Sequence, residues 1–478
     1  MDALRRTKIV ATLGPATDDQ ATLVAMIRAG VDGVRINCSH GTRNDFIRRA
    51  WQARDAAATA GRHVAIMFDL QGPKIRLHES SRRADLDQGD TVRIVGDPKA
   101  SGATGALVVD WPGVVDAADP GTSELVIGDG APRIAIAERT KGALMGTCVI
   151  PGTALPRKGA FLTHAQVRSM ALTDKDRQDV RTALDAGADF IALSFVNGAD
   201  DIRELRGEIL GSSARIIAKI ETLSAIQHLD EIVDAADAVM VARGDLGVEA
   251  GVSRVPLLQK QIIQAANERG RMVITATQML ESMIDAPEPT RAEASDVANA
   301  VIDGTSCVML SGETAVGHYP IETIQQMAEI ALDAQDGVTP VVVEGGAASG
   351  DGRTTAESVM RAAVLLAREI KAAALVIPTA TGGSVRAAAR FRPRRPILAL
   401  CNDGEVARQL ALEWGVIPEP LHQRPEEPIE ALVERCLMRA QRRLSLPDGA
   451  RVVLTSGPQV ATPGATSLIA VHRLGSSA

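Results

Sequence analysis

The feature that most constrains this chain is a regular alternation of short apolar runs and longer amphipathic segments along most of its first 335 residues. The runs are nearly continuously apolar, as strands of a parallel sheet covered on both faces must be. Strands are expected at Lys8–Leu13, Gly33–Asn37, His63–Leu70, Phe190–Phe195, Arg215–Glu221, Ala238–Ala242, Met272–Thr277 and Cys307–Ser311. Helices are expected at Asp18–Ala29, Asn44–Ala60, Asp174–Ala186, Asp201–Leu210, Thr222–Ala235, Val255–Glu268, Thr290–Asp303 and Ile321–Ala334. About eight strand–helix units predict an α/β fold, a closed (β/α)8 TIM barrel.

Two parts of the chain break this repeat. Residues 77–168 are rich in Val, Thr, Gly and Asp, which predicts a small β domain inserted at one end of the barrel. Residues 336–478 begin with a Gly/Ala-rich linker and then resume the alternation, which predicts a C-terminal α/β domain. There we expect a helix at Ala356–Ile370 and strands at Ala374–Pro378, Ile397–Leu400 and Val452–Thr455. The barrel would then comprise residues 1–76 and 169–335.

Composition narrows the class of protein. A net charge of -7 argues against a nucleic-acid binder, which usually carries a basic domain. The five cysteines are scattered, with no CxxC pair, which favours a reducing compartment over a disulfide or zinc framework. No apolar run is long enough to span a bilayer, and the N-terminus lacks the apolar core of a signal peptide. We therefore expect a cytoplasmic protein with no nucleic-acid or membrane partner.

Polar residues gather at the C-terminal ends of the predicted strands. They are Asn37, Asp69, Ser194, Lys219, Glu221, Thr277 and Ser311. A strand often ends in a polar residue where it reaches solvent, and this explains one or two such positions. It does not explain this concentration of chargeable groups. Active sites of this fold are built from those ends and the loops that follow them.

A metal site is predicted from two carboxylates and a lysine. Lys219 and Glu221 are two residues apart on one strand, so both side chains point to the same face. Asp245 follows the next strand between glycines, of which Gly244 would let backbone N–H groups approach an anion. Two carboxylates with few other ligands suit Mg²⁺. The spacing alone equally permits an ordinary ion pair between Lys219 and Glu221.

Two arginines also follow neighbouring strands, Arg35 in the second and Arg76 after the third. Together they would form a phosphate clamp with the planar fork geometry that a lysine lacks. Either one alone would more often be a structural ion pair.

These motifs together resemble the pyruvate kinase family. The similar segments include RINCSHG, DLQGPKIR, IAKIE, MVARGDLG and TATQMLESM, followed by PTRAEASDVANAV and MLSGETA. They occur in the family's order and cover essentially the whole predicted barrel. The inserted domain and the C-terminal domain match in layout and more loosely in residues.

The resemblance implies transfer of a phosphoryl group from phosphoenolpyruvate to ADP, giving pyruvate and ATP, the last step of glycolysis. It places Mg²⁺, with Mn²⁺ as an alternative, on Glu221 and Asp245, and a second Mg²⁺ with the nucleotide. Lys219 would stabilise the transferred group, while Gly244, Asp245 and Thr277 would bind the substrate carboxylate. The remaining implied roles are phosphate and nucleotide contacts by Arg35, Asn37, Arg76 and Lys158, and a protonating water relay near Thr277 and Ser311. A homotetramer is the family's assembly.

The chain departs from the family's pattern at two places. At the hinge of the inserted lid, relatives usually read Lys-Gly-Val-Asn-Leu-Pro-Gly, and this chain keeps Lys158 but has Phe161, Thr163 and His164 in place of the Asn, Pro and Gly. The change could alter lid closure or nucleotide selectivity, but a benign hinge variant is the favoured interpretation.

The second departure is in the loop that binds an activating phosphate ester in relatives, here Thr379, Thr381, Gly382, Gly383 and Ser384. Hydroxyls and N–H groups at such a turn form an anion nest. Gly383 replaces the family's basic residue, and Ser456-Gly457-Pro458-Gln459 replaces a Trp-bearing loop of some relatives. An allosteric effector of the AMP or sugar-monophosphate class is therefore favoured over a bisphosphate. The alternative is an ordinary turn without a ligand.

The resemblance also implies that K⁺ is not required. The family's K⁺ is held by oxygens matching Asn37, Ser39, Asp69 and the backbone of Leu70. Potassium-activated relatives carry Glu where this chain has Lys74, whose ammonium supplies a tethered positive charge instead.

Two other functions fit parts of the sequence. A pyruvate-enolate aldolase or lyase on the same barrel would also use Glu and Asp on Mg²⁺, but needs neither the lid nor the paired arginines. A catalytically silent paralogue would be expected to lose Lys219, Glu221, Asp245 or Thr277, and all four are present.

Overall fold

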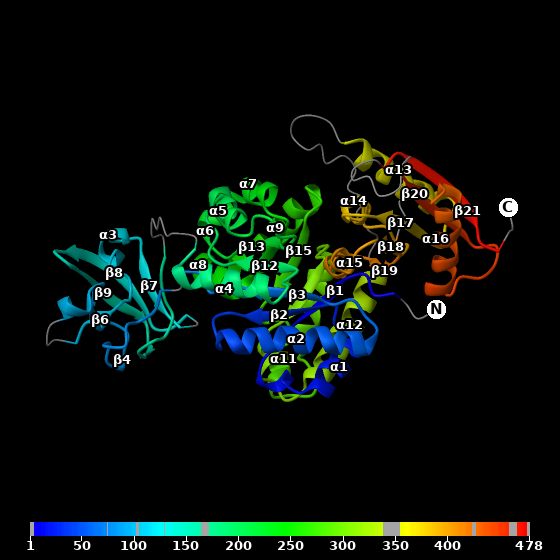
Figure 1. Ribbon diagram of the computed structural model, residues 1–478. Helices are drawn as coiled ribbons and strands as arrows, with labels where there is room; N and C mark the ends of the chain where they lie inside the picture. Colours follow the sequence, from blue (N-terminus) through cyan, green and yellow to red (C-terminus); the bar gives the residue numbers. More distant parts are fainter. Residues whose placement is uncertain are drawn as a thin grey trace.

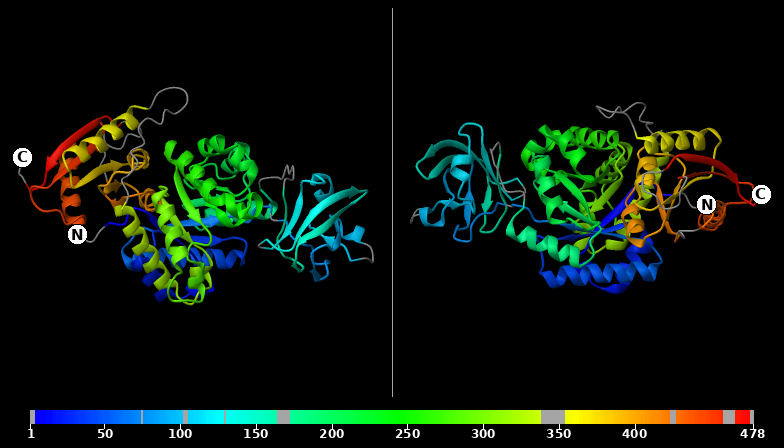
Figure 2. Two further views of the ribbon diagram at one scale, coloured as in Figure 1. Left: turned by 180° about the vertical axis from the view of Figure 1, so that it is seen from behind. Right: turned by 45° about the horizontal axis from the view of Figure 1, so that its top comes forward.

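A computed structural model describes residues 4–73, 75–101, 105–128, 130–163, 172–337, 354–422, 427–457 and 466–475. Three parts lie in a row: the inserted β region at one end, the barrel in the middle and the C-terminal α/β region at the other end (Figure 1). Two further views keep this order, with the C-terminal region always on the side of the barrel away from the insert (Figure 2).

The middle part is a closed barrel of eight parallel strands, which confirms the predicted TIM-barrel architecture. Around the barrel the strands run in the order β1-β16-β15-β14-β13-β12-β3-β2. Their bounds are β1 Lys8–Thr12, β2 Gly33–Asn37, β3 Ala65–Asp69, β12 Phe190–Leu193, β13 Arg215–Ile220, β14 Ala238–Ala242, β15 Met272–Ala276 and β16 Cys307–Leu310. Almost every residue of these strands is buried because side chains on one face fill the barrel and those on the other face meet helices.

Helices surround the barrel between the strands. Their bounds are α1 Gln20–Ala29, α2 Arg43–Ala60, α4 Asp174–Asp185, α5 Ala199–Glu208, α6 Leu223–Gln227, α7 Leu229–Ala235, α8 Arg243–Ala250, α9 Val255–Glu268, α10 Arg291–Ile302, α11 Gly312–Ala315 and α12 Pro320–Gly337. Thr42, Thr173 and Thr290 cap three of them by accepting a backbone N–H with the side chain.

Two of the helices differ from the sequence expectation. The single helix expected at Thr222–Ala235 is split at His228 into α6 and α7. The glycine-containing segment around Asp245, for which no helix was predicted, forms α8. Leu246 is fully buried, and its packing holds this segment against the barrel despite the low helix propensity of glycine.

The inserted region contains β4 Ala84–Leu86, β5 Thr91–Val95, β6 Leu107–Val108, β7 Glu124–Ile127, β8 Arg133–Thr140, β9 Ala143–Ile150, β10 Gly152–Ala154, β11 Ala160–Leu162 and α3 Val114–Ala117. Six of these strands form one sheet in the order β11-β7-β8-β9-β5-β6, with its own apolar core. The two connecting segments meet in a bridge between Arg76 and Gly159. The insert is therefore connected to the barrel by two adjacent segments of the chain.

The C-terminal region is a five-stranded sheet in the order β19-β18-β17-β20-β21. Its strands are β17 Ala374–Thr379, β18 Ile397–Cys401, β19 Val416–Pro420, β20 Arg451–Ser456 and β21 Leu468–Arg473, of which only β21 pairs antiparallel. Its helices are α13 Thr355–Glu369, α14 Gly383–Ala389, α15 Gly404–Leu410 and α16 Ile429–Arg443. The sequence had predicted three of these strands and α13.

Across the described residues no helix is both long and apolar enough to cross a membrane.

Candidate functional site

Candidate site residues converge at the C-terminal ends of the barrel strands. Lys219 is in β13 and Glu221 directly follows it, while Asp69 ends β3 and Ser194 follows β12. All four side chains are buried, with Lys219 the most exposed at 9%. The strand register brings β3, β12 and β13 next to one another, so these groups share one small volume.

Lys219 is the centre of this cluster. Its Nζ donates to Ser194 Oγ at 2.6 Å and lies 3.4 Å from Asp69 Oδ1 and 3.3 Å from Glu221 Oε2. Burial disfavours the charged ammonium, but Asp69 and Glu221 outweigh this effect and raise the pKa of Lys219. Lys219 is therefore a fixed positive charge in a buried site at the C-terminal ends of the barrel strands, hereafter the mouth.

Ser194 links Lys219 to the backbone of the third strand. Its hydroxyl accepts from Lys219 and donates to the carbonyl oxygen of Leu70 at 2.7 Å. The sequence marked Ser194 only as a polar strand end, and no motif assigned it a role. Its position between Lys219 and Leu70 makes it a positioning residue.

Arg35 enters the mouth from β2. Its Nε donates to Asp69 Oδ2 at 2.7 Å, and its NH1 donates to Thr12 Oγ1 at 3.2 Å. Burial opposes the charge of Asp69, but Lys219 and Arg35 lower the pKa of this carboxyl below its usual value. One buried carboxylate thus holds two cations in place.

Glu221 is less well compensated. Its Oε1 accepts the backbone N–H of Phe195 at 2.7 Å, but its buried Oε2 has no hydrogen-bond partner among the described residues. Burial raises the pKa of Glu221 to about 7, with Lys219 opposing the rise and Asp245 adding to it. Phe195 adopts a positive φ of 57°, which turns its N–H toward the carboxylate.

Glu221 and Asp245 fit the coordination preference of a divalent cation. Asp245 lies in the first turn of α8, half-buried, close enough to Glu221 to raise its pKa. Glu221 Oε2 has an ion pair with Lys219 at 3.3 Å but no hydrogen bond among the described residues, so a metal ion could occupy its remaining lone pair. The described residues contain no cluster of three or more His, Cys, Asp or Glu able to hold a metal, whereas Mg²⁺ often takes one or two carboxylates with water and substrate oxygens.

Thr277 lies beside Gly244 at the ends of β15 and β14. Gly244 N donates to Thr277 Oγ1 at 2.8 Å. Thr277 and Gln278 both have positive φ, at 69° and 52°, an unusual conformation for residues with side chains. Arg243 holds this turn by donating to the carbonyl oxygen of Thr277 at 2.6 Å, a role that no sequence motif indicated.

Ser311 follows β16 at the same end of the barrel. Its Oγ is buried with no hydrogen-bond partner among the described residues. Glu313 Oε2 accepts the N–H of Ser311 at 2.6 Å, and its other oxygen accepts the N–H of Leu280 at 3.2 Å. The buried Glu313 therefore fixes the loops after β15 and β16, a role that the SGETA motif did not reveal.

Other candidates are less tightly connected to the mouth. Arg76 NH1 donates to the carbonyl oxygen of Arg157, and no contact in the described parts of the chain joins Arg76 to Arg35. Lys158 is exposed and directly precedes Gly159, which pairs with Arg76 in the bridge. Lys74 and His164 lie outside the described residues.

The oxygens matched to a monovalent-cation site are largely engaged within the protein. Asn37 Oδ1 accepts the N–H of Ser39 at 3.0 Å, and the carbonyl of Leu70 accepts from Ser194. Asp69 binds Arg35 and Lys219.

Comparisons with known proteins agree with this geometry. Residues 4–324 match the family described as "Pyruvate kinase, barrel domain", and residues 357–472 match "Pyruvate kinase, alpha/beta domain". The chain belongs to the pyruvate kinase family. It is therefore an enzyme that transfers a phosphoryl group.

Individual pyruvate kinases are similar over nearly the whole chain. "Pyruvate kinase" of Geobacillus stearothermophilus is 37% identical over 98% of this chain and 80% of its own length. "Pyruvate kinase" of Methylorubrum extorquens is 37% identical over 98% of both chains. "Pyruvate kinase" of Mycobacterium tuberculosis strain H37Rv is 39% identical over 98% of this chain and 99% of its own.

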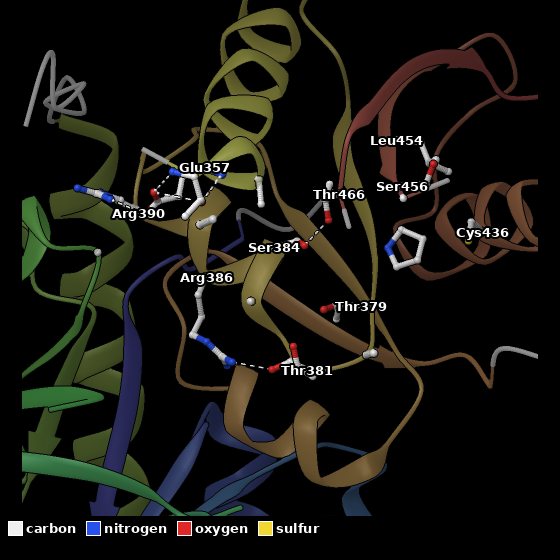
Figure 3. A pocket seen from close by; sticks show the side chains of 18 of the residues that line it. Glu357, Thr379, Thr381, Ser384, Arg386, Arg390, Cys436, Leu454, Ser456 and Thr466 are labelled. Atoms are coloured by element: carbon white, nitrogen blue, oxygen red, sulfur yellow. Dashed lines mark hydrogen bonds and ion pairs between the residues drawn. The ribbon is translucent and has the colours of Figure 1, made fainter. Parts of the chain in front are cut away.

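The candidate effector loop of this pyruvate kinase family member lines a cavity of about 340 Å³ (Figure 3). Thr379, Thr381, Gly383 and Ser384 all contribute to its wall. Gly382, with φ 81°, donates its N–H to Thr379 Oγ1 at 2.9 Å, and Ser384 Oγ is 2.6 Å from Thr466 Oγ1. The Pro458–Gln459 part of the facing loop lies outside the described residues.

Arg386, which the sequence did not single out, lies over this loop. Its NH2 donates to the carbonyl oxygen of Thr381 at 2.6 Å (Figure 3). A Cβ on Gly382 would come within 2.7 Å of Arg386 NH1, so glycine is needed for the guanidinium to lie this close. A cation therefore stands beside the loop although Gly383 replaces the basic residue within it.

Proposed function

We propose that this enzyme catalyses Mg²⁺-dependent transfer of the phosphoryl group of phosphoenolpyruvate to ADP at the barrel mouth. The observation that carries the proposal is Lys219, held between Asp69 and Glu221, together with the buried Glu221 Oε2, whose only described partner is the ion pair with Lys219. A cation beside an incomplete metal site suits a reaction that moves a highly charged group.

Glu221 and Asp245 would hold the Mg²⁺, with Mn²⁺ able to replace it. The metal would neutralise charge on the substrate's carboxylate and phosphoryl oxygens. Bound substrate oxygens and water would complete the coordination that two carboxylates begin.

Lys219 would contact the phosphoryl group and stabilise the enolate left when it departs. Its ammonium is already oriented by Ser194 and two carboxylates, so little reorganisation is needed during the reaction. Arg35 would contact the phosphate from the opposite side of Asp69, which fixes its guanidinium.

The substrate carboxylate would bind at the start of α8. The first N–H groups of a helix have no acceptor within the helix, and they attract anions. Gly244 N, now bonded to Thr277 Oγ1, and Asp245 N would face the carboxylate, with the Thr277 hydroxyl as a third group.

Transfer breaks the bond between phosphorus and the enol oxygen and forms a bond to the terminal phosphate oxygen of ADP. The enolate then takes a proton on its terminal carbon to become pyruvate. Thr277 and Ser311 would pass that proton through water, and the unpartnered Ser311 Oγ is a suitable anchor for such water.

The nucleotide, with a second Mg²⁺, would lie between the mouth and the lid, contacted by Arg35, Asn37, Arg76 and Lys158. Arg76 and Lys158 are both beside the narrow hinge. Closure of the lid would bring them toward the phosphates and replace the contact between Arg76 and Arg157.

Three further proposals concern conditions and regulation. The enzyme works without K⁺, because the Asn37 side-chain oxygen and the Leu70 carbonyl oxygen already accept hydrogen bonds and Lys74 supplies a charge. A phosphate ester of the AMP or sugar-monophosphate class activates it through the 379–384 loop. It acts in cytoplasmic glycolysis as a homotetramer, with catalytic barrel 1–76 and 169–335, lid 77–168 and effector-binding domain 336–478.

The test is a coupled assay of pyruvate formation from phosphoenolpyruvate and ADP. Full activity with Mg²⁺, loss on chelation with EDTA and recovery on adding Mg²⁺ are expected. Pyruvate formation that persists unchanged in EDTA would contradict the metal assignment. Release of pyruvate without ATP would point instead to a lyase or phosphatase.

A further inference from the structure

The side chain of Arg243, the first residue of α8, contacts the turn that follows β15. Its Nε donates to the carbonyl oxygens of Ala276 and Thr277 at 3.3 and 3.2 Å. Its NH2 donates to the carbonyl oxygens of Thr277 and Gln278 at 2.6 and 3.1 Å. One guanidinium therefore holds three consecutive carbonyl groups around the candidate site residue Thr277.

The third guanidinium nitrogen is held by helices outside this turn. Arg243 NH1 pairs with Asp296 Oδ2 of α10 at 2.6 Å and donates to Gln259 Oε1 of α9 at 3.4 Å. The side chain of Arg243 is only 10% exposed, so the charge is largely shielded from water. The position of the guanidinium is therefore fixed by α9 and α10 as well as by the turn.

The turn itself needs such support because its backbone is strained. Thr277 and Gln278 have φ of 69° and 52°, which residues with side chains rarely adopt. A conformation of this kind persists only where surrounding contacts hold it. Here it places Thr277 Oγ1 2.8 Å from Gly244 N, where the substrate carboxylate is proposed to bind.

The Thr277 hydroxyl is fully engaged in this conformation. It accepts the N–H of Gly244, and its single proton is donated to the carbonyl oxygen of Ala276 at 2.6 Å. Donation to the substrate or to a water requires this proton to leave the Ala276 carbonyl. Ala276 is fully buried, and taking a hydrogen bond from a buried carbonyl without replacing it costs free energy.

We propose that Arg243 is a positioning residue that frees the Thr277 hydroxyl for the reaction. When the hydroxyl turns toward substrate or water, Arg243 Nε continues to donate to the Ala276 carbonyl that the hydroxyl has left. Asp296 keeps the guanidinium in place during this exchange. The inference rests on the role proposed above for Thr277, and adds the group that makes its hydrogen-bond exchange inexpensive.

A double-mutant cycle tests whether Arg243 acts through the Thr277 hydroxyl. Arg243→Met should lower kcat for pyruvate formation about tenfold or more when Thr277 is present. Thr277→Val keeps the branched shape but removes the hydroxyl, so adding Arg243→Met to it should lower kcat by less than about threefold. The Mg²⁺ concentration for half-maximal activity should change by less than about threefold in Arg243→Met, because this change leaves the two carboxylates in place.

The matched control is Arg54→Met at the other end of the barrel. Arg54 also donates to two backbone carbonyls, those of Val64 and Gly187, and pairs with Asp189 at 2.7 Å. This substitution should lower the thermal midpoint, as Arg243→Met does, while kcat stays within about threefold of wild type. A general loss of stability is thereby separated from a loss of positioning.

Two milder variants keep the cycle usable if circular dichroism shows that Arg243→Met does not fold. Asp296→Asn retains an acceptor for Arg243 NH1 but removes the paired charge, and it should lower kcat about threefold only when the Thr277 hydroxyl is present. Arg243→Lys retains the charge but has one nitrogen for three carbonyls, so its kcat should lie between those of wild type and Arg243→Met.

The outcomes separate this inference from the proposed function. Equal losses of kcat with and without the Thr277 hydroxyl would overturn the role of Arg243 and leave the proposed reaction untouched. Wild-type activity in Arg243→Met would also overturn it. A Thr277→Val variant with wild-type kcat, or a wild-type enzyme that forms no pyruvate, would instead contradict the proposed function on which the inference rests.

Discussion

The two ends of strands β13, β14 and β15 differ in how their positively charged side chains are paired. At the C-terminal ends, Lys219 is buried between two carboxylates, and Asp69 holds Arg35 as well. At the N-terminal ends, Arg271 and its neighbour Arg386 have only carbonyl partners among the described residues. The mouth is prearranged around its charges, whereas at the far end two arginines have only backbone carbonyls as described partners.

The difference in charge pairing between the two ends agrees with the different demands of catalysis and of regulation by a ligand. Catalysis gains most from charges that are already oriented before the reaction begins, because no reorganisation is then needed. A regulatory site must instead change on binding, since a ligand shifts an equilibrium only through its differential affinity for two states. The contrast leads to tests of both ends.

The largest effect should come from removing the central cation of the mouth. Lys219→Met should lower kcat roughly a hundred- to a thousandfold, because one preorganised electrostatic donor is lost. Asp69 and Glu221 would also lose their shared cation, so a lower thermal midpoint is expected, and folding is checked by circular dichroism. Lys141→Met, on an exposed turn of the insert, is the control. Activity within a few-fold of wild type would remove Lys219 from the chemistry.

The next effect tests Glu221 as a metal ligand. Glu221→Gln should weaken activation by Mg²⁺ by about a hundredfold, beyond the usual loss from a supporting residue around a metal. The control is Glu249→Gln. Glu249 is a second carboxyl whose pKa burial raises to about 7, but it lies at the end of α8. Equal Mg²⁺ dependence in the two variants would show that Glu221 is merely a buried acid.

Glu249 itself should control a pH-dependent part of stability. Its pKa is raised from 4.5 to about 7 by burial, so the folded protein binds a proton that the unfolded chain releases in this window. The free energy of unfolding should therefore fall as pH rises from 4.5 to 7. Glu249→Gln should raise stability at pH 8 by about 1–2 kcal/mol, reduced for partial exposure, with little change near pH 4.

Thermal unfolding across this pH range measures the effect. The exposed Glu434→Gln on α16 controls for a general change in net charge. A Glu249→Gln variant that is less stable than wild type at pH 8 would contradict this account of the buried carboxyl.

The smallest expected effect concerns the monovalent cation. Replacing KCl by tetramethylammonium should change the rate by less than about twofold, because tethered cations already supply the positive field near the phosphate. Lys74→Glu should make the enzyme respond to K⁺. Strong activation of the wild type by KCl, or a Lys74→Glu variant without any response, would refute potassium independence.

The sequence predicted the barrel well because its strands are short, apolar and regularly spaced. Gly33–Asn37 and Ala238–Ala242 have the predicted bounds, and the others differ only at their ends. It also predicted that Lys219 and Glu221 share a face, since strand side chains alternate, and their 3.3 Å contact agrees.

Other features depend on contacts between residues that are far apart in the sequence, which local sequence patterns cannot predict. Residues 243–250 are helical despite their glycines, with Leu246 fully buried against the barrel. Ser194 and Glu313 acquire their roles from neighbours on different strands. Arg386 and Arg271 are 115 residues apart in the sequence, and only the packing of two domains brings them to one cavity.

The measurement that most directly tests the contrast between the two ends is phosphoenolpyruvate saturation of the wild-type enzyme with and without a phosphate monoester. We expect a sigmoidal curve at constant ADP and Mg²⁺. AMP or glucose 6-phosphate should shift the half-saturating concentration downward while the maximal rate stays nearly constant. Hyperbolic curves that neither compound moves would contradict an account in which a ligand at the 379–384 loop governs the catalytic ends.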